Sequence, residues 1–414
     1  MLIFGAVLTI FDKKEKIEDE IYNKIKNLDV KFSLGENYLS NLNEFHLIVR
    51  SPSCMPNIKE LLDAKENGTK VTSEIELLME LSPASIIAVT GSDGKTTTTS
   101  LIYEIIKKEK ENTYLGGNIG IPLFAKISEI KKEDIIVLEL SSFQLMELKV
   151  SPKIAVVTNV TPNHLDIHKS YEEYIEAKKN IFKNQDNNGK VVLNYDNEIT
   201  KEFAKKANGN VEYFSSKNAL ENGVVLDKNI IKICKNKCEE EIIDVNNIFL
   251  RGKHMYENIC AAIAVTKDLV NIETIVEVVK NFKGVEHRLE FVREINNVKI
   301  YNDSIGSSPT RTIAGIKAFE EEIILIAGGY DKNLDYTELG KEIVTCNKVK
   351  TVILMGNTAK KICEAIQMEL DNKNKELEIY LAGTLEDAVK HSVKSAKPRT
   401  NNIIFASISK FRYV

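Results

Sequence analysis

The chain has 414 residues, of which 43% are hydrophobic and 28% are charged, and its formal net charge is −4. This composition is typical of a globular protein with large apolar cores, and the lack of a basic block excludes a nucleic-acid-binding surface. The length predicts two or three domains, and the longest apolar runs, such as 135–140, are too short to span a membrane.

The six cysteines are scattered along the chain and predict reduced thiols in a cytoplasmic protein. Cys234 and Cys238 form the only close pair, and no second Cys or His pair lies nearby to complete a zinc site. A metal or disulfide role is therefore the weaker alternative. The apolar start at 1–4 lacks basic residues and a cleavage site, so we expect no signal peptide.

Residues 1–78 open with a strand over 7–12 that ends in Asp12, followed by a charged helical stretch to about residue 27. Short strands are expected over 30–32 and 46–50, and a turn over 51–56. A carboxylate at a strand end is where a Rossmann-type unit holds a ribose or base. A plain solvent-facing strand end explains Asp12 equally well, because no glycine-rich turn precedes it.

The next stretch predicts a phosphate site: an apolar strand over 86–90, a glycine loop over 91–94 and a helix from Lys95 to about 108. Glycines let the backbone approach an anion, and the first N–H groups of the helix point toward it. Lys95 adds positive charge for the β- and γ-phosphates, and the Thr96 hydroxyl is placed to bind Mg²⁺. A strict P-loop needs glycine where Val89 stands, so this is the variant T-G-x-x-G-K-T. The expected ATP-binding residues are Gly91, Ser92, Asp93, Gly94, Lys95, Thr96 and Thr97.

Glu139 lies inside the nearly continuous apolar run over 135–140, which predicts a strand buried on both faces. An ionised carboxylate there needs a cation or a hydrogen-bond partner. A structural ion pair is one explanation. A magnesium ligand is favoured, because the phosphate loop is expected on a neighbouring strand.

The stretch 153–166 predicts a strand followed by a polar loop with His164, at the sheet edge where open α/β folds bind ligands. His164 is explained equally well as a metal or phosphate neighbour and as a loop cap. A helix over 171–182, capped by Ser170, carries Lys178, which by pattern alone is a solvated lysine. An apolar helix is expected over 259–270, with Asn258 as a capping residue before it.

From residue 285 onward, strands and helices alternate again and predict a Rossmann-like domain. Its polar loops, 303–308 and 328–332, follow two of these strands. Lys332 could meet an anion there or face water. The expected strands are 298–302, 323–327, 351–355, 379–382 and 402–405.

Together these stretches resemble the Mur ligases of peptidoglycan synthesis, over about residues 5–405. The motifs that carry the resemblance occur in order, and they are Thr90-Gly91-x-x-Gly94-Lys95-Thr96-Thr97, Gly117-Asn118-Ile119-Gly120, Glu139-Leu140-Ser141-Ser142-Phe143-Gln144-Leu145, Asn159-Val160-Thr161-Pro162-Asn163-His164-Leu165-Asp166, His287-Arg288-Leu289-Glu290, Asn302-Asp303-Ser304 and Gly328-Gly329. The Glu-Leu-Ser-Ser-Phe-Gln and Gly-Gly-Asn-Ile-Gly forms are similar to those of members that add D-glutamate to UDP-N-acetylmuramoyl-L-alanine.

The resemblance implies an α/β fold of three domains. These are an incomplete Rossmann-like domain for the UDP-linked substrate (1–78), a central P-loop ATPase domain with a parallel sheet (79–284) and an incomplete Rossmann-like domain for the amino acid (285–414). Relative to the family pattern, we expect the chain to be shortened at both ends. Met255 stands where the family commonly has asparagine.

The implied activity is an ATP-dependent amide ligase that works through an acyl phosphate, with ATP and two Mg²⁺ ions. The implied catalytic residues are Lys95, Glu139, His164 and Lys178. Lys178 matches the family lysine that is carbamylated, and it would share a second Mg²⁺ with His164, while Thr96 and Glu139 hold the first.

The remaining implied contacts divide between the nucleotide and the two other substrates. Asn258, Arg288 and Asp303 would hold adenine, phosphate and ribose. Asp12, Ser51, Asn118, Ser141, Ser307 and Lys332 would bind the muramoyl substrate or D-glutamate. The partners are therefore two small molecules, and we expect a cytoplasmic monomer without nucleic-acid or membrane contacts. Two alternatives remain open: a sister Mur or folylpolyglutamate ligase, and a catalytically inactive nucleotide-binding homologue.

Overall fold

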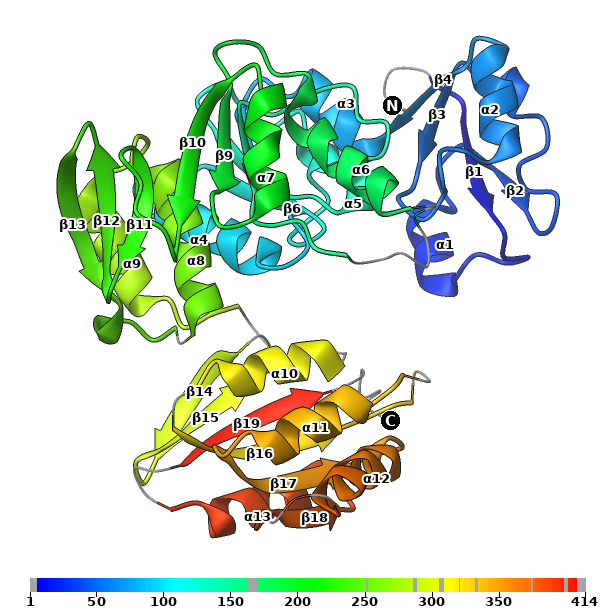
Figure 1. Cartoon of the computed structure of the whole chain (residues 1–414). Coiled ribbons are helices and arrows are strands. Elements are labelled where there is room, and N and C mark those ends of the chain that lie inside the picture. The colour runs from blue at the N-terminus through cyan, green and yellow to red at the C-terminus, as the bar shows by residue number, and fades with distance from the viewer. Residues whose placement is uncertain are drawn as a thin grey trace.

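The computed structural model describes residues 6–162, 168, 170–250, 252–285, 289–304, 309–319, 321–331, 334–371, 373, 375–397 and 401–407. Over these residues the chain forms two sheets of two strands, one of nine strands and one of six (Figure 1). Helices alternate with strands through both large sheets, so the fold is α/β with a large, mostly parallel sheet. None of the helices in the described part of the chain is long and apolar enough to cross a bilayer.

The N-terminal part holds the two small sheets, each a parallel pair. Its elements are β1 (Leu8–Asp12), α1 (Asp19–Ile25), β2 (Val30–Leu34), η2 (Leu42–Glu44), β3 (Leu47–Arg50), α2 (Lys59–Glu66) and β4 (Lys70–Ser73). Leu61 and Ala64 of α2 are buried with Leu42, and half-buried side chains of β1, β3 and β4 pack against them. Helix α2 therefore covers one small core that draws on both sheets.

The central part is built on the nine-stranded sheet, whose strand order is β13-β12-β11-β10-β9-β8-β5-β7-β6. Strands from β11 to β6 pair in parallel, whereas β12 and β13 are antiparallel additions at one edge. The elements are α3 (Glu74–Leu81), β5 (Ser85–Thr90), α4 (Lys95–Glu109), β6 (Thr113–Gly117), η3 (Leu123–Lys126), β7 (Ile135–Glu139), α5 (Ser142–Leu145), β8 (Ile154–Val157), α6 (Tyr171–Lys183), β9 (Lys190–Asn194), α7 (Glu198–Phe203), η4 (Ala204–Lys206), β10 (Asn210–Ser215), β11 (Gly223–Asp227), β12 (Ile230–Lys235), β13 (Cys238–Asp244), η5 (Val245–Asn247), α8 (Lys253–Thr266) and α9 (Ile272–Asn281).

Helices cover both faces of this sheet, because successive side chains of a strand point to opposite sides. In β5, Ile86 and Ala88 join the core with α3, α5, α6 and α7, while Ile87 and Val89 join the core with α4, α8 and α9. Both faces of the strand are buried, which explains its continuous apolar sequence.

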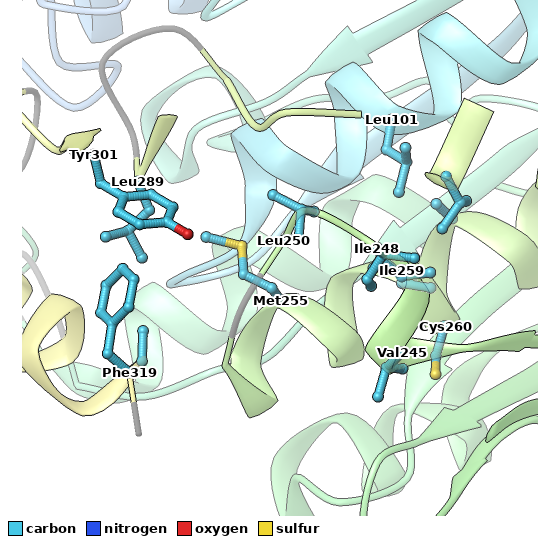
Figure 2. Packing of buried hydrophobic residues seen from close by; sticks show 14 of the residues in the cluster. Leu101, Val245, Ile248, Leu250, Met255, Ile259, Cys260, Leu289, Tyr301 and Phe319 are labelled. Carbon is cyan, nitrogen blue, oxygen red and sulfur yellow. The ribbon is translucent and has the colours of Figure 1, made fainter. Parts of the chain in front are cut away.

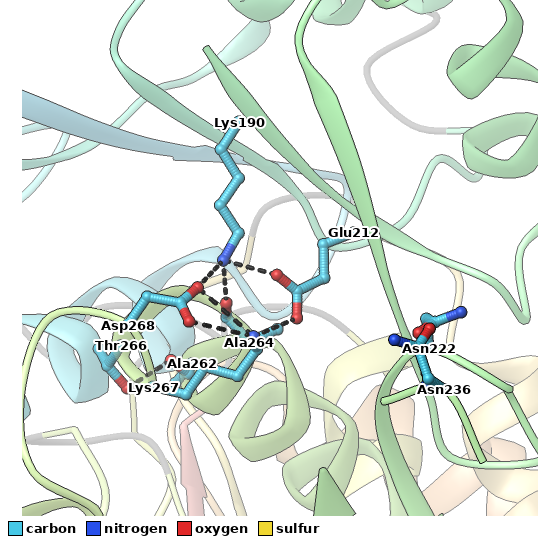
Figure 3. A network of polar contacts seen from close by, with 9 residues as sticks. All are labelled: Lys190, Glu212, Asn222, Asn236, Ala262, Ala264, Thr266, Lys267 and Asp268. Atoms are coloured by element: carbon cyan, nitrogen blue, oxygen red, sulfur yellow. Dashed lines mark hydrogen bonds and ion pairs between the residues drawn. The ribbon is translucent and has the colours of Figure 1, made fainter. Parts of the chain in front are cut away.

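A half-buried charge network ties the end of α8 to strands β9 and β10 (Figure 3). Lys190 Nζ lies 2.6 Å from Glu212 Oε2 and 2.9 Å from Asp268 Oδ2, and it donates to the carbonyl of Ala264 at 2.7 Å. Lys267 Nζ reaches the other oxygen of Glu212 at 3.1 Å. These contacts fix the last turn of α8 against the sheet.

The edge strand β13 carries three consecutive carboxylates, Glu239, Glu240 and Glu241, all exposed to solvent. Lys232 Nζ of β12 pairs with Glu239 of β13 at 3.0 Å and with Asp227 of β11 at 2.8 Å. The edge strand therefore presents a run of three carboxylates, one of which is paired with Lys232.

The C-terminal part is built on the six-stranded sheet, with strand order β14-β15-β19-β16-β17-β18. All pairs are parallel except the β14–β15 hairpin. The elements are β14 (Glu290–Ile295), β15 (Val298–Asn302), α10 (Pro309–Lys317), β16 (Glu322–Gly328), α11 (Thr337–Thr345), β17 (Val349–Met355), α12 (Ala359–Leu370), β18 (Glu378–Ala382), α13 (Leu385–Ser395) and β19 (Asn401–Ser407). Buried side chains place α10, α11 and α12 on one face and α13 on the other.

Met255 joins the cores of the central and C-terminal parts (Figure 2). Its side chain is 3% exposed and lies between Leu250 on one side and Leu289, Tyr301 and Phe319 on the other. The apolar interior is therefore continuous from the nine-stranded sheet to the six-stranded sheet.

Most predicted strands are confirmed to within a residue or two, but the structure corrects the bounds of one helix and adds one strand. Helix α8 begins at Lys253 and ends at Thr266, whereas the sequence predicted 259–270. Gly252, with φ +98°, lets the chain turn sharply into this earlier start. Strand β14 was not among the predicted strands, the first of which in this part was 298–302.

Candidate active site

The glycine loop between β5 and α4 is shaped by two glycines with positive φ, +153° at Gly91 and +79° at Gly94. A Cβ on Gly91 would lie 1.8 Å from Thr158 Oγ1, and one on Gly94 would lie 2.2 Å from Asn258 Oδ1. No larger side chain fits at either position. The loop therefore places bare backbone at the N-terminus of α4, the arrangement that binds phosphate.

Two lysines meet at one carbonyl of this loop. Lys95 Nζ donates to the carbonyls of Gly91 at 3.0 Å and Ser92 at 2.9 Å, and Lys178 Nζ, from α6, donates to Gly91 at 2.8 Å. Lys178 is only 1% exposed, and its amine lies 4.5 Å from the centre of the Tyr174 ring. Burial, and then the nearby Lys95 ammonium, hold the pKa of Lys178 well below its usual 10.5. The pattern-based expectation of a solvated lysine is wrong.

Glu139 ends β7, directly beside β5 in the sheet, and is 1% exposed. Asn118 Nδ2 donates to Glu139 Oε1 at 2.8 Å, while no described residue hydrogen-bonds to the buried Oε2. A buried carboxylate oxygen without a hydrogen-bond donor fits a cation ligand. Thr96 lies half-buried in the first turn of α4, the position from which a P-loop hydroxyl reaches Mg²⁺.

The loop after β8 holds the phosphate loop from one side. Ser92 Oγ donates to the carbonyl of Thr161 at 2.9 Å and shares a 2.9 Å hydrogen bond with the hydroxyl of Tyr174. Asn159 Oδ1 accepts from the backbone N–H of Asp93 at 2.9 Å. Ser92 therefore holds the loop in shape through its hydroxyl, and Asp93 remains exposed beside it.

A cleft of about 890 Å³ lies between the central and C-terminal parts and contains several of the predicted nucleotide contacts. It is lined by Asp93, Gly94, Thr97, Met255, Asn258, Leu289, Asp303 and Gly315, among others. Asn258 Oδ1 accepts from Thr98 Oγ1 at 3.4 Å, and Asp303 Oδ1 accepts from the N–H of Leu289 at 3.1 Å. The cleft thus opens from the phosphate loop toward two buried polar side chains, as a nucleoside site would.

None of the candidate substrate residues in the described part lines this cleft, and all of them except Asn118, which donates to Glu139, make local contacts. Asp12 Oδ1 accepts from the N–H of Lys14 at 2.9 Å, and Ser51 Oγ lies 2.9 Å from Ser53 Oγ. Ser141 caps α5 in a capping box with Gln144. Four predicted site residues, His164, Arg288, Ser307 and Lys332, lie outside the described residues.

Sequence reasoning missed Tyr174 and His168. Tyr174 contacts both Ser92 and Lys178, and the ring of His168 packs against Tyr174 and hydrogen-bonds to Ser142 Oγ at 2.9 Å. The four-residue spacing of Tyr174 and Lys178 places them on one face of a helix and was the available signal. Nothing in the local sequence marks His168.

Comparison with known proteins identifies two regions of the chain. Residues 89–266 match the Mur ligase middle domain, and residues 287–408 match the Mur ligase, glutamate ligase domain. The chain is 51% identical over 395 residues to a UDP-N-acetylmuramoylalanine--D-glutamate ligase of Acetivibrio thermocellus, covering 95% of this chain and 84% of the relative. A relative of the same name from Ruminiclostridium cellulolyticum is 50% identical over 383 residues, 92% of this chain and 82% of its own.

Solved structures agree with this fold. MurF from Acinetobacter baumannii superposes with a TM-score of 0.61 at 16% identity, covering 88% of this chain and 90% of that one. UDP-N-acetylmuramate-alanine ligase MurC from Thermotoga maritima gives 0.58 at 18% identity, covering 96% and 90%. At these identities the likeness is one of fold.

Proposed function

The chain belongs to the Mur ligase family, and we propose that it joins D-glutamate to UDP-N-acetylmuramoyl-L-alanine, with ATP consumed, in peptidoglycan synthesis. Relatives of about half-identical sequence carry the name of this activity. The observation that carries the proposal is the meeting of Lys95 and Lys178 at the carbonyl of Gly91, beside the buried Glu139.

We further propose that the three parts of the chain act as three domains, 1–78 for the UDP-linked substrate, 79–284 for ATP and 285–414 for the amino acid. The separate sheets of these parts support the division. Both later parts place the carboxyl ends of parallel strands near the cleft that contains Asn258 and Asp303.

In the first step, a carboxylate oxygen of the substrate's L-alanyl group attacks the γ-phosphorus of ATP, an O–P bond forms, and ADP leaves. Both reactants are negative, so fixed positive charge supplies much of the stabilisation. The Lys95 ammonium and the N–H groups at the start of α4 supply it here. Their positions are preset, because Lys95 is already held on the loop carbonyls.

Thr96 and Glu139 would hold one Mg²⁺, which neutralises phosphate charge when bound. The donor set fits, since Glu139 Oε2 is buried without a hydrogen-bond donor among the described residues. Asn118 orients the carboxylate through Oε1 and leaves Oε2 for the ion.

We propose that Lys178 is carbamylated. Its lowered pKa favours the neutral amine, and a neutral amine attacks CO₂ to form an N–C bond with loss of one proton. The product is an anion at the end of a buried side chain. Together with His164 it would hold a second Mg²⁺, and as an anion it would attract the Lys95 ammonium.

In the second step, the amino group of D-glutamate attacks the acyl carbon. The tetrahedral intermediate expels inorganic phosphate, the nitrogen loses a proton, and an amide remains. We assign Asp12, Ser51, Asn118 and Ser141 to the UDP-linked substrate. Ser307 and Lys332 are assigned to D-glutamate, and Arg288, Asn258 and Asp303 to the nucleotide.

We also propose that the enzyme works as a cytoplasmic monomer. All assigned residues come from one chain, and the substrates include ATP. Light scattering after size exclusion would measure the mass of the purified protein against the 46.7 kDa of one chain.

The function is tested by phosphate release from ATP in the presence of UDP-N-acetylmuramoyl-L-alanine, with and without D-glutamate. We expect release that requires both substrates, together with an amide product of the corresponding mass. Release driven equally well by another amino acid would favour a sister ligase. ATP binding without any release would contradict the ligase assignment.

A further inference from the structure

Arg50 is a buried cation at the junction between the N-terminal and central parts. It ends β3, directly before the 51–56 turn, and is only 7% exposed. Its Nη1 donates to the carbonyl of Cys54 at 3.1 Å, and its Nη2 donates to the carbonyl of Met146 at 2.9 Å. One nitrogen of the side chain thus binds the 51–56 turn, and the other binds the central part at Met146.

Arg50 forms no ion pair with any described residue. Burial lowers the pKa of Arg50, and Glu147 opposes this change. A buried guanidinium loses its hydration, and two carbonyl acceptors offset this free-energy cost less than a carboxylate would. Arg50 is therefore not explained by its contribution to stability alone. Its fork of donors instead fixes two backbone segments at a defined angle.

The turn that Arg50 reaches, 145–148, is also held from the opposite side by α6. Asn180 Nδ2 donates to the carbonyl of Leu145 at 3.0 Å, and Asn184 Nδ2 donates to that of Leu148 at 3.4 Å. Glu147 in this turn has φ +62°, a conformation that side chains adopt only when their surroundings hold them. The turn is therefore a fixed connection between the two parts.

The same helix carries Lys178 two residues before Asn180, and Lys178 donates to the phosphate loop at Gly91. A continuous series of hydrogen bonds thus runs from the 51–56 turn through Arg50, the 145–148 turn and α6 to the phosphate loop. These contacts, made to backbone carbonyls, fix the position of the N-terminal part relative to the phosphate loop.

We propose that Arg50 is a positioning residue for the UDP-linked substrate, holding the 51–56 turn so that the bound substrate's carboxylate end meets the γ-phosphate. This inference rests on the proposed function, since it assigns the 51–56 turn to that substrate. Arg50 itself touches backbone only, so its effect is on the binding and orientation of the substrate.

The test compares Arg50→Ala and Arg50→Lys with the full-length wild-type chain in the phosphate-release assay. For Arg50→Ala we expect KM for UDP-N-acetylmuramoyl-L-alanine to rise about tenfold, while KM for ATP stays within about twofold. Arg50→Lys keeps the charge but lacks the fork, so it should recover only part of the loss. Asn180→Ala, which releases the turn from the other side, should raise the same KM.

Lys65→Ala is the matched control. Lys65 also crosses the junction, pairing with Glu147 at 2.6 Å, but both side chains are partly exposed, so this ion pair contributes little. Its KM values should stay near wild type. Low millimolar methylguanidinium should restore part of the Arg50→Ala loss and leave Lys65→Ala unaffected.

An Arg50→Ala enzyme that folds and keeps the wild-type KM for the UDP-linked substrate would overturn the inference. If Arg50→Ala fails to fold, Arg50→Lys and Asn180→Ala decide it by the same KM comparison. A wild-type chain that neither binds this substrate nor releases phosphate with it would overturn the proposed function instead, and the inference with it.

Discussion

Two lysine amines share one backbone carbonyl at the centre of the site, and we propose a different part in the chemistry for each. Lys95 comes from the phosphate loop itself and is half-buried, whereas Lys178 approaches from α6 and is almost completely buried. The first is suited to remain a cation near phosphate. The second is suited to lose its proton.

Replacing Lys95 with alanine should reduce ligase-dependent phosphate release by about a hundredfold or more, because it removes preset positive charge at the γ-phosphate. The measurement is the steady-state rate with both substrates saturating. Lys108→Ala is the control, since Lys108 lies on the same helix but is exposed and pairs with Glu277 at 2.8 Å. An unchanged rate in Lys95→Ala would rule out its phosphate role.

Replacing Lys178 with alanine should also abolish activity, but added short carboxylates should restore part of it. Acetate or formate can occupy the space that the side chain leaves and supply the negative charge that the carbamate would carry. The rate is measured against carboxylate concentration, with Lys179→Ala from the same helix as the control. A Lys178→Ala enzyme with full activity and no response to carboxylate would contradict the carbamate.

At the scale of elements, the first half of α8 contains Glu257, a half-buried carboxyl group whose charge depends on pH. Glu257 accepts from Asn194 Nδ2 at 2.7 Å and from Ser216 Oγ at 3.4 Å. Burial, and then the neighbouring carboxylate of Asp196, raise the pKa of Glu257 to about 7, while Lys217 opposes the shift. The folded chain therefore holds a proton here that the unfolded chain, with an ordinary glutamate, releases near pH 4.5.

Because the folded-state pKa is the higher one, this group's contribution to stability is greatest below about pH 4.5 and is lost as pH rises through 7. Glu257→Gln removes the charge, keeps one oxygen to accept from Asn194 and can donate from its NH2 group to Ser216 Oγ, so it should be more stable than wild type at pH 8, by about 2 kcal/mol. The gain should shrink at pH 5. Urea unfolding at both pH values measures it, and a gain independent of pH would contradict the raised pKa.

The sequence was a good guide where one physical signal dominated. Strands β5 and β7 were predicted to within one residue, because a strand buried on both faces is a continuous apolar run. The start of α8 was missed because residues 253–258 are mostly polar and interrupt the apolar pattern around Met255, and the continuous apolar run begins only at Ile259. Strand β14 was missed because four of its six residues are exposed and its polar and apolar residues do not alternate regularly.

The site was predictable only in part, for a related reason. The phosphate loop combines residue type with a fixed local spacing, which a sequence displays directly. The burial of Lys178 and the contact of Arg50 with Met146 depend on segments 87 and 96 residues away. Neither environment is visible in the residues around the lysine or the arginine.

At the scale of the whole molecule, the central and C-terminal parts share one apolar interior through Met255. Met255→Ala should lower the free energy of unfolding by about 2–4 kcal/mol and loosen the C-terminal part, because it leaves a cavity at the join. Urea unfolding measures the first effect, and limited proteolysis near residues 282–289 measures the second.

Met255→Leu is the control, since a side chain of similar volume should change stability by less than about 1.5 kcal/mol. Met255→Asn would place an amide among Leu289, Tyr301 and Phe319 and should destabilise the join at least as much as alanine does. Equal protease resistance in Met255→Ala and wild type would show that other contacts hold the two parts together.

The three carboxylates of β13 affect how two copies of the molecule meet in a concentrated solution. A strand at the end of a sheet has unpaired N–H and C=O groups that can pair with the same strand of another copy. Two such edges brought together here would each present Glu239, Glu240 and Glu241, and like charges directly opposite one another repel. These carboxylates lie on the sheet edge opposite β6. Their repulsion disfavours pairing of β13 with the same strand of another copy, and so it disfavours aggregation through this edge.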